Sequence, residues 1–207
     1  MEIELKYSID NEAKIEEILN DQSVTSIKDE NSDEDIDMHA VYFDTEEGDL
    51  SQNAMAFRIR KEGAKLMATL KWGGSSEGEM HKREEINIPV DGEDQLEKPD
   101  MSIFDQSEAG PMLDTIIKGK ELKPLMVIDF LRRQARLDTG KAICELSIDS
   151  GKVFCGGKED KILEMEIELY SGQEEEIVEL GRQLSEKYNL KPGEISKFRR
   201  GLNLLDG

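Results

Sequence analysis

Charged and apolar side chains alternate strictly over the first seven residues of the chain. Glu2, Glu4 and Lys6 are charged, and Ile3 and Leu5 lie between them. In a β-strand this spacing puts the charged side chains on one face and the apolar side chains on the other. A strand with its polar face in water has the same pattern, so this stretch by itself predicts a strand and no function.

The same alternation returns along the chain, and it predicts a protein built mainly of strands. Strands are expected over residues 1–7, 39–45, 55–61, 65–72, 81–90, 125–137, 142–148 and 162–170, with a short edge at 153–155. Turn signals such as Glu62-Gly63, Thr139-Gly140 and Ser150-Gly151 favour hairpins and an antiparallel sheet. Amphipathic helices are expected over 11–20 and 173–188, short helices within 102–118, and loops over 29–37 and 73–78.

Composition limits the partners of the protein. The chain has 207 residues, of which 37% are hydrophobic and 36% charged, which suits one domain over residues 1–207 with a buried core. A net charge of −20 disfavours nucleic acid and anionic membrane surfaces as partners, so an anionic substrate needs a local basic pocket or accompanying cations. Cys144 and Cys155 lack zinc-site spacing and are expected to be free thiols. With no apolar run of ~20 residues and no leader expected before Glu2, we predict a cytoplasmic protein.

The charged residues within the predicted strands admit two arrangements. In the first, they form the outside of a sandwich, where cross-strand pairs contribute about 0.2–1 kcal/mol each. In the second, they point into a closed eight-stranded barrel, where burial without partners is costly and bound ions must offset it. Clustered carboxylates bind Mg²⁺, and Arg and Lys bind phosphate, so such a tunnel suits a metal-bound polyphosphate. Alternation alone does not decide between the two.

An ordered set of these segments resembles the CYTH superfamily, the triphosphate tunnel metalloenzymes. Glu2 to Lys6 resembles the ExExK signature of that family. Further matches are Tyr42 to Thr45, Phe57 to Arg60 (L-R-I-R), Thr69 to Lys71 (T-x-K), Arg83 to Glu85 (R-x-E), Arg132-Arg133, Asp149, the series Glu164, Glu166 and Glu168, and Ser196-Lys197. The resemblance covers nearly the whole chain and is closest to the bacterial inorganic triphosphatase type.

The resemblance implies an α+β fold, in which an eight-stranded antiparallel barrel closes around a charged tunnel and helices pack outside. It implies that phosphates are bound by Lys6, Arg58, Arg60, Lys71, Arg83, Arg132 and Lys197. It implies Mg²⁺ or Mn²⁺ ligands at Glu2, Glu4, Asp149, Glu164, Glu166 and Glu168, and catalytic roles for Glu4, Lys6 and Lys71. One metal ion would bridge phosphate oxygens, and a second would activate water for in-line attack. The sequence does not say which of Arg132 and Arg133, or of Arg199 and Arg200, faces the tunnel.

The implied activity is hydrolysis of a small triphosphate, with inorganic triphosphate first, by a monomer or homodimer. Three alternatives stay open: a class IV-type adenylate cyclase, a thiamine triphosphatase and a non-catalytic polyphosphate-binding module. No segment clearly reads adenine, and an aromatic content of 5% weakly disfavours thiamine stacking. The presence of every expected metal acid favours an enzyme. His39 and His81 are interpreted as strand-end or loop residues, and Tyr42 and Trp72 as packing residues.

Overall fold

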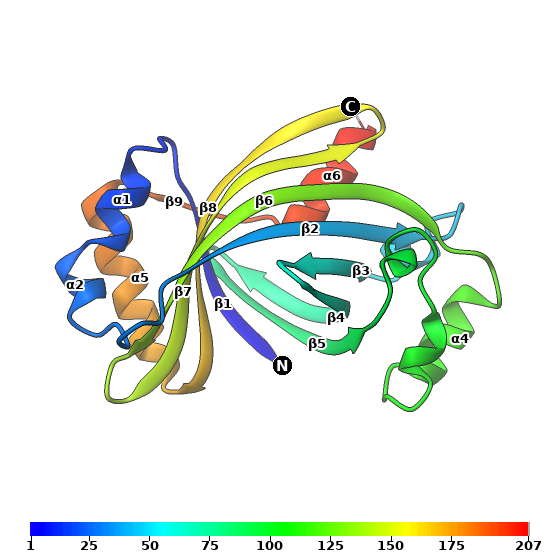
Figure 1. The fold of residues 1–207 in the computed structure, drawn as a ribbon, viewed down its shortest axis with the longest axis horizontal. Helices are drawn as coiled ribbons and strands as arrows, with labels where there is room; N and C mark the ends of the chain where they lie inside the picture. The colour runs from blue at the N-terminus through cyan, green and yellow to red at the C-terminus, as the bar shows by residue number, and fades with distance from the viewer. Residues whose placement is uncertain (207) are drawn as a thin grey trace.

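Hydrogen bonds between the first and fifth strands close the sheet of this protein into a barrel (Figure 1). The computed structural model describes residues 1–206. The strands are β1 (Glu2–Ser8), β2 (Glu34–Asp44), β3 (Met55–Glu62), β4 (Lys65–Glu77), β5 (Met80–Val90), β6 (Lys123–Asp138), β7 (Ala142–Cys155), β8 (Lys158–Gly172) and β9 (Lys191–Pro192). Their order is β5-β4-β3-β2-β6-β7-β8-β1, all antiparallel, and the short β9 pairs with the outer end of β1. The predicted eight-stranded antiparallel barrel is confirmed.

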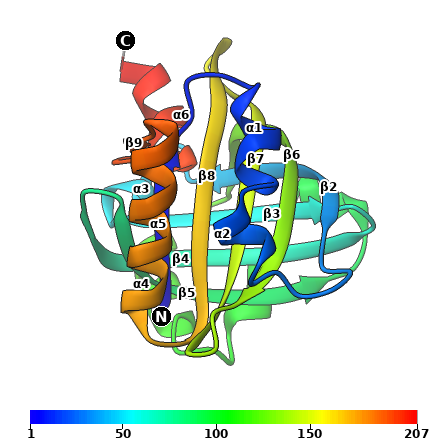
Figure 2. The ribbon, with the colours of Figure 1, turned by 90° about the vertical axis from the view of Figure 1, so that its left-hand side faces the viewer.

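Helices cover two separate regions of the outer surface of the barrel. The helices are α1 (Lys14–Leu19), α2 (Gln22–Thr25), α3 (Asp49–Gln52), α4 (Gly110–Ile117), α5 (Glu174–Tyr188) and α6 (Lys197–Asp206), with 3₁₀ turns η1 (Glu93–Leu96) and η2 (Met101–Phe104). Figure 2 shows α1, α2 and α5 lying over β7 and β8. None of the helices described within residues 1–206 has the length and apolar character needed to cross a bilayer.

The outward rows of the strands supply the apolar side chains beneath these helices. Leu5 and Tyr7 of β1 pack with Ile177 of α5 in one cluster, and Phe57 of β3 packs with Phe104 of η2 in another. Complete burial of such a side chain is worth about 1.5–3 kcal/mol. These two clusters orient the strands, because the alternate residues of each strand must then face inward.

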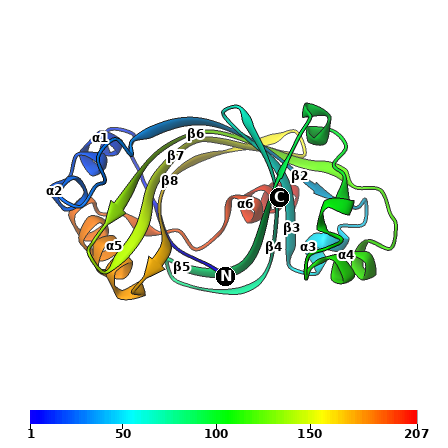
Figure 3. The ribbon, with the colours of Figure 1, turned by 60° about the horizontal axis from the view of Figure 1, so that its bottom comes forward.

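A third apolar cluster lies on the inner face of the barrel, where aliphatic side chains were not expected. On β6, Ile128 and Phe130 have the same phase as Arg132, so they point toward the inside. Helix α6 covers them with Phe198 and Leu202, and Figure 3 shows this helix inside the ring of strands. The predicted helices lie outside the barrel, whereas α6, which the sequence did not predict, lies inside it, so the interior has a charged part and an apolar part.

The turn predicted at Ser150-Gly151 is wrong, because β7 runs straight through it. Gly151 pairs with Phe130 of β6. A Cβ at position 151 would lie 2.1 Å from the carbonyl oxygen of Asp129. The glycine here therefore permits close approach of two strands and does not reverse the chain.

Three other segments are more regular than predicted. The acidic segment expected to be a loop over 29–37 becomes strand from Glu34, which pairs with Gln134 of β6. The loop expected over 73–78 is mostly strand β4, interrupted by a bulge between Trp72 and Ser75. The C-terminal tail forms α6, which packs the partly buried Phe198, Leu202 and Leu204 against the inner face of the barrel.

Candidate active site

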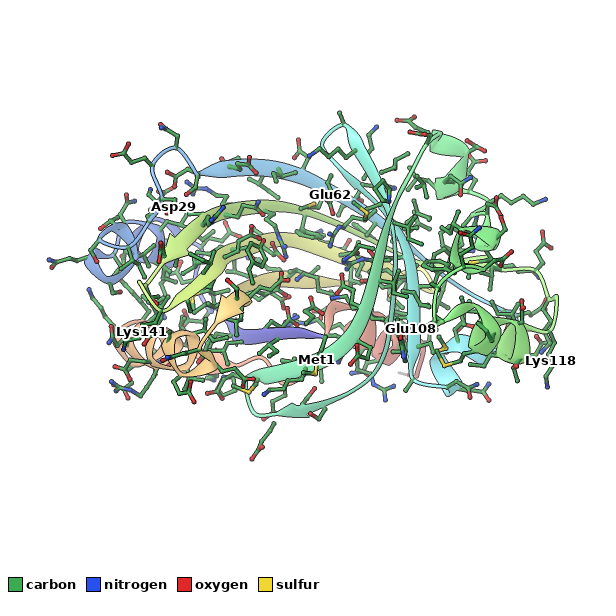
Figure 4. All side chains as sticks on the ribbon, turned by 90° about the horizontal axis from the view of Figure 1, so that it is seen from below. Met1, Asp29, Glu62, Glu108, Lys118 and Lys141 are labelled. Carbon is green, nitrogen blue, oxygen red and sulfur yellow. The ribbon has the colours of Figure 1, made fainter. Side chains whose placement is uncertain are left out.

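The inward rows of the strands line one cavity of about 900 Å³, which is partly open to solvent. All seven predicted phosphate-binding residues line it: Lys6, Arg58, Arg60, Lys71, Arg83, Arg132 and Lys197. Four of the predicted metal ligands also line it: Glu2, Glu4, Glu166 and Glu168. Figure 4 looks toward the barrel from below, with Met1 at the start of β1 and Glu62 at the end of β3, and shows side chains filling the space between the strands.

Strand register explains how residues distant in sequence meet in this cavity. Glu4 and Lys6 of β1 lie opposite Glu168 and Glu166 of β8. Directly opposed residues on one face have Cβ atoms about 4.5–5.5 Å apart. The first and last charged rows of the chain are therefore neighbours, although more than 150 residues separate them in sequence.

Six residues at the inner end of the cavity form a network that we call the paired cluster: Lys6, Arg132, Asp149, Glu164, Glu166 and Lys197. Arg132 donates to both carboxylate oxygens of Asp149, at 2.8 and 2.7 Å, and to Glu166 at 2.7 Å. Lys197 Nζ lies 2.6 Å from Asp149 and 2.5 Å from Glu164. Three cations face three carboxylates, so the charges in this cluster balance.

This balance shifts the pKa values of the paired cluster. Burial raises the pKa of a carboxyl group, but at Glu166 the charges of Lys197, Lys6 and Arg132 outweigh it and hold the pKa well below its usual value. At Asp149, Arg132 and Lys197 likewise outweigh burial and lower the pKa. These acids stay ionised at neutral pH. Asp149 and Glu164 are fully buried behind the cavity wall.

A second group nearer β5, which we call the acid-rich cluster, has the opposite character: Glu2, Glu4, Lys71, Glu85 and Glu168. Lys71 Nζ lies 2.7 Å from Glu2 and 2.6 Å from Glu85. Within residues 1–206, Glu168 has no ion pair and Glu4 has only a long one, 3.5 Å from Lys6. The cluster therefore holds four carboxyl groups and one lysine, which contacts two of them.

The pKa values show the cost of this excess negative charge. Burial, followed by the charge of Glu2, raises the pKa of Glu168 to about 8. Burial also raises the pKa of Glu2 to about 7, against the effect of Lys71. Lys71 and Arg58 outweigh burial at Glu85 and lower its pKa to about 2. A bound divalent cation would relieve this repulsion, because it favours the charged form of every neighbouring carboxylate.

The residues present fit a hard divalent cation. Carboxylate oxygens are the protein ligands that Mg²⁺ and Mn²⁺ prefer. Oxygens of Asp149, Glu164 and Glu166 lie within 4.8 Å of one another, but Lys197 and Arg132 already contact this set. In the acid-rich cluster Glu4 has only a long ion pair and Lys71 contacts Glu2, so a cation there would compete with fewer cationic side chains than in the paired cluster.

Arg58 and Arg60 of β3 line the cavity, and Arg58 has no ion pair within residues 1–206. Arg58 donates to the hydroxyl of Tyr42 at 3.0 Å, and its buried Nε has no hydrogen-bond partner in the described structure. Burial and the neighbouring Arg58 lower the pKa of Arg60, which is paired with Glu62. An anion between these guanidinium groups would satisfy the free N–H and reduce their repulsion.

The structure answers both questions that the sequence left open about paired arginines. Arg132 faces the cavity, whereas Arg133 faces outward and contacts Glu16 at 2.5 Å. Near the start of α6, Arg200 lies 3.5 Å from Glu164, and Arg199 is exposed. Arg200 therefore extends the positive side of the paired cluster.

Sequence reasoning missed several residues of the site. Tyr42 was interpreted as packing, yet it lines the cavity, bonds Arg58 and stacks on Phe198 with ring centroids 5.1 Å apart. His81 is buried, and its two ring nitrogens contact Ser76 at 2.9 Å and Gly193 at 2.8 Å. The sequence did contain a signal for His81, because it lies two positions before Arg83 on β5 and therefore on the same face of the strand. None existed for Phe198, because α6 was not expected inside the barrel.

The protein is thus a closed antiparallel barrel whose interior is lined by glutamate, arginine and lysine side chains. The CYTH domain model matches residues 1–202, and the chain belongs to the CYTH family. It is 28% identical over 160 residues to the inorganic triphosphatase of Haemophilus influenzae, which covers 77% of this chain and 44% of that protein. The chain thus spans less than half the length of that curated relative.

Two solved structures share the fold over almost their whole length. The first is a Hippeastrum protein, described as an adenylyl cyclase candidate with a dominant triphosphatase activity. It superposes with a TM-score of 0.72 at 21% identity and covers 96% of this chain and 94% of its own. The second, a Bacillus halodurans protein described as an adenylate cyclase candidate, gives a TM-score of 0.59 at 19% identity over 97% and 96%.

Proposed function

We propose that this protein hydrolyses inorganic triphosphate to pyrophosphate and phosphate, and that it requires Mg²⁺ or Mn²⁺. The observation that carries the proposal is that one partly open cavity brings together Arg58, whose Nε has no hydrogen-bond partner in the described structure, and four carboxyl groups with a single lysine among them. A polyphosphate bound to divalent cations carries both signs of charge and satisfies both walls. The activity of the Haemophilus influenzae relative supports the same substrate class.

The basic residues bind and orient the phosphate chain. Arg58 and Arg60 present guanidinium groups from β3, which suits bidentate contact with phosphate oxygens. Lys6 and Lys197 present ammonium groups from the paired cluster, which holds them in place before substrate arrives. Donors fixed in this way stabilise charge that develops on the transferred and leaving oxygens.

Glu2, Glu4 and Glu168 would hold the divalent cation. When bound, it supplies a Lewis acid for phosphate oxygens and lowers the pKa of water. Lys71 now contacts Glu2 and Glu85, and we propose that it turns to the leaving phosphate when these acids are neutralised. Glu4 lies between Glu2 and Lys6 on the inward row of β1, so it would link the residues proposed to hold the cation with those proposed to bind the phosphates.

The test is a phosphate-release assay with inorganic triphosphate, ATP and thiamine triphosphate, with cyclic AMP measured in parallel. We expect inorganic triphosphate to be hydrolysed fastest and only with Mg²⁺ or Mn²⁺. Glu4→Gln should lower turnover at least about 100-fold, because loss of a ligand exceeds the 10–100-fold effect of its supporting groups.

The matched control is Glu84→Gln, whose side chain is 47% exposed and lies outside the cavity. It should keep full turnover. Wild-type turnover by Glu4→Gln at saturating Mg²⁺ would show that Glu4 is not a ligand. Cyclic AMP formation from ATP without triphosphate hydrolysis would replace the hydrolase with a cyclase.

A further inference from the structure

His81 is a buried residue that the proposed chemistry does not use. It precedes Arg83 and Glu85 on the inward row of β5 and lies directly opposite Glu4 of β1. Its side chain does not line the cavity, and the residue is 2% exposed. A histidine so close to the site and so well enclosed has both ring nitrogens engaged, one with Ser76 and one with Gly193.

Gly193 is held between β1 and β5 from both sides. Its N–H donates to the carbonyl oxygen of Lys6 at 2.8 Å, and its own carbonyl lies 2.8 Å from Nε2 of His81. A Cβ at position 193 would lie 2.5 Å from Cγ of Lys6, so the glycine backbone packs directly on that side chain. A carbonyl can only accept, so Nε2 carries the proton and Nδ1 accepts from Ser76.

Gly193 is the first residue of the connector 193–196, which joins β9 to α6 and leads to Lys197. Lys197 Nζ lies 2.8 Å from Oε1 of Glu166, and Lys6 Nζ lies 2.8 Å from the same oxygen. Carboxylates of the paired cluster attract both ammonium groups, and the path of the backbone into α6 decides where Lys197 enters this set. Within the described structure, Gly193 is the residue of connector 193–196 with hydrogen bonds to the barrel.

We propose that His81 is a positioning residue: its hydrogen bond to Gly193 fixes the connector and thereby the place of Lys197 among the phosphates. The inference rests on the proposed function, because it takes Lys197 as a phosphate-binding group. Ser76 orients the imidazole by occupying Nδ1. Loss of His81 would leave the Lys197 side chain intact, but its ammonium group could move away from Glu166.

A double-mutant cycle on kcat/KM for inorganic triphosphate tests this. His81→Ala should lower kcat/KM by up to about 100-fold, as expected for a small displacement of a binding group. In a Lys197→Ala background, the same change should cost less than about threefold, because the group that His81 positions is gone. Losses that multiply in the double mutant would overturn the proposal. The control is His39→Ala, at the only other histidine, which is exposed and pairs with Asp129.

Two further measurements keep the result decisive. If His81→Ala does not fold, the cycle is run with Ser76→Ala, which removes the hydrogen bond that orients the imidazole and should likewise lose its effect when Lys197 is absent. Amide hydrogen exchange in His81→Ala should be faster than in the wild type over residues 194–201 and unchanged in β1 and β8. Unchanged exchange over 194–201 would contradict the proposal. If the wild type hydrolyses no triphosphate, the proposed function fails. The double-mutant cycle is then calculated from the Kd values for inorganic triphosphate, measured by calorimetry for the wild type and the variants.

Discussion

The paired cluster and the acid-rich cluster are neighbours built from the same residue types, yet they differ in charge balance. Glu166 and Glu168 are two residues apart on β8, and Lys6 and Glu4 are two residues apart on β1. Glu166 has three cationic partners and a depressed pKa, whereas Glu168 has no ion pair within residues 1–206 and a pKa raised to about 8. The charges of the first cluster are matched within the protein, whereas the second places four carboxyl groups beside one lysine, and we propose that a bound cation relieves the resulting repulsion.

The largest expected effect is on stability in the absence of metal. Asp149→Ala leaves Arg132 and Lys197 buried without a main partner and should cost about 3–5 kcal/mol of unfolding free energy. Glu168→Gln should be close to neutral, because burial raises the pKa of Glu168 to about 8 and the carboxyl group that the amide replaces is already largely uncharged near pH 7. Urea denaturation in chelator measures both. A greater loss for Glu168→Gln than for Asp149→Ala would reverse the assignment of the two clusters.

The next effect is stabilisation by the cation itself. At a Mg²⁺ or Mn²⁺ concentration 100 times the dissociation constant, the folded state should gain about 2.7 kcal/mol. Glu168→Gln should lose most of this gain, whereas Glu84→Gln should keep it. Thermal denaturation with and without the ion measures the difference. An undiminished shift in Glu168→Gln would exclude Glu168 as a ligand.

The smallest expected effect on stability concerns Asp21, a carboxylate outside the barrel. It serves as a reference for a buried carboxylate whose hydrogen bonds are all made within the protein. Asp21 is buried, caps α2 through Ser23, and accepts from Lys187 at 2.5 Å and Tyr188 at 2.6 Å. Burial raises its pKa, but these hydrogen bonds outweigh burial and depress the pKa below the usual 3.8. A depressed acid pKa contributes stability above the unfolded value that is lost as pH falls through the folded value.

Asp21→Asn should therefore cost about 1.5 kcal/mol at pH 7, the scale of a hydrogen bond to a charged group, and progressively less below about pH 4. Wild type and variant are compared by urea denaturation from pH 7 to pH 3, so that other titrating groups cancel. A difference that stays constant over this range would mean that Asp21 titrates alike in both states.

Much of the barrel could be predicted because alternation acts locally. The apolar partners Ile3 and Leu5 require a buried face, so the phase of Glu2, Glu4 and Lys6 follows from their neighbours. The same reasoning places Arg132 and Arg133 on opposite faces, but it does not say which face is inside. It failed at Gly151, because a glycine that permits strand contact and one that permits a turn look alike in sequence.

The amino-acid sequence by itself determined most of the strands and their two-faced character, and it grouped the charged side chains of each strand on one face, since each of these depends on residues two positions apart. Only the tertiary structure decided which charges are paired, because strand register brings Lys6 to Glu166 and Arg132 to Asp149 across long separations. It also decided that α6 enters the barrel and brings Lys197 with it, because the inner apolar surface that α6 buries exists only after β2, β6 and β7 have come together.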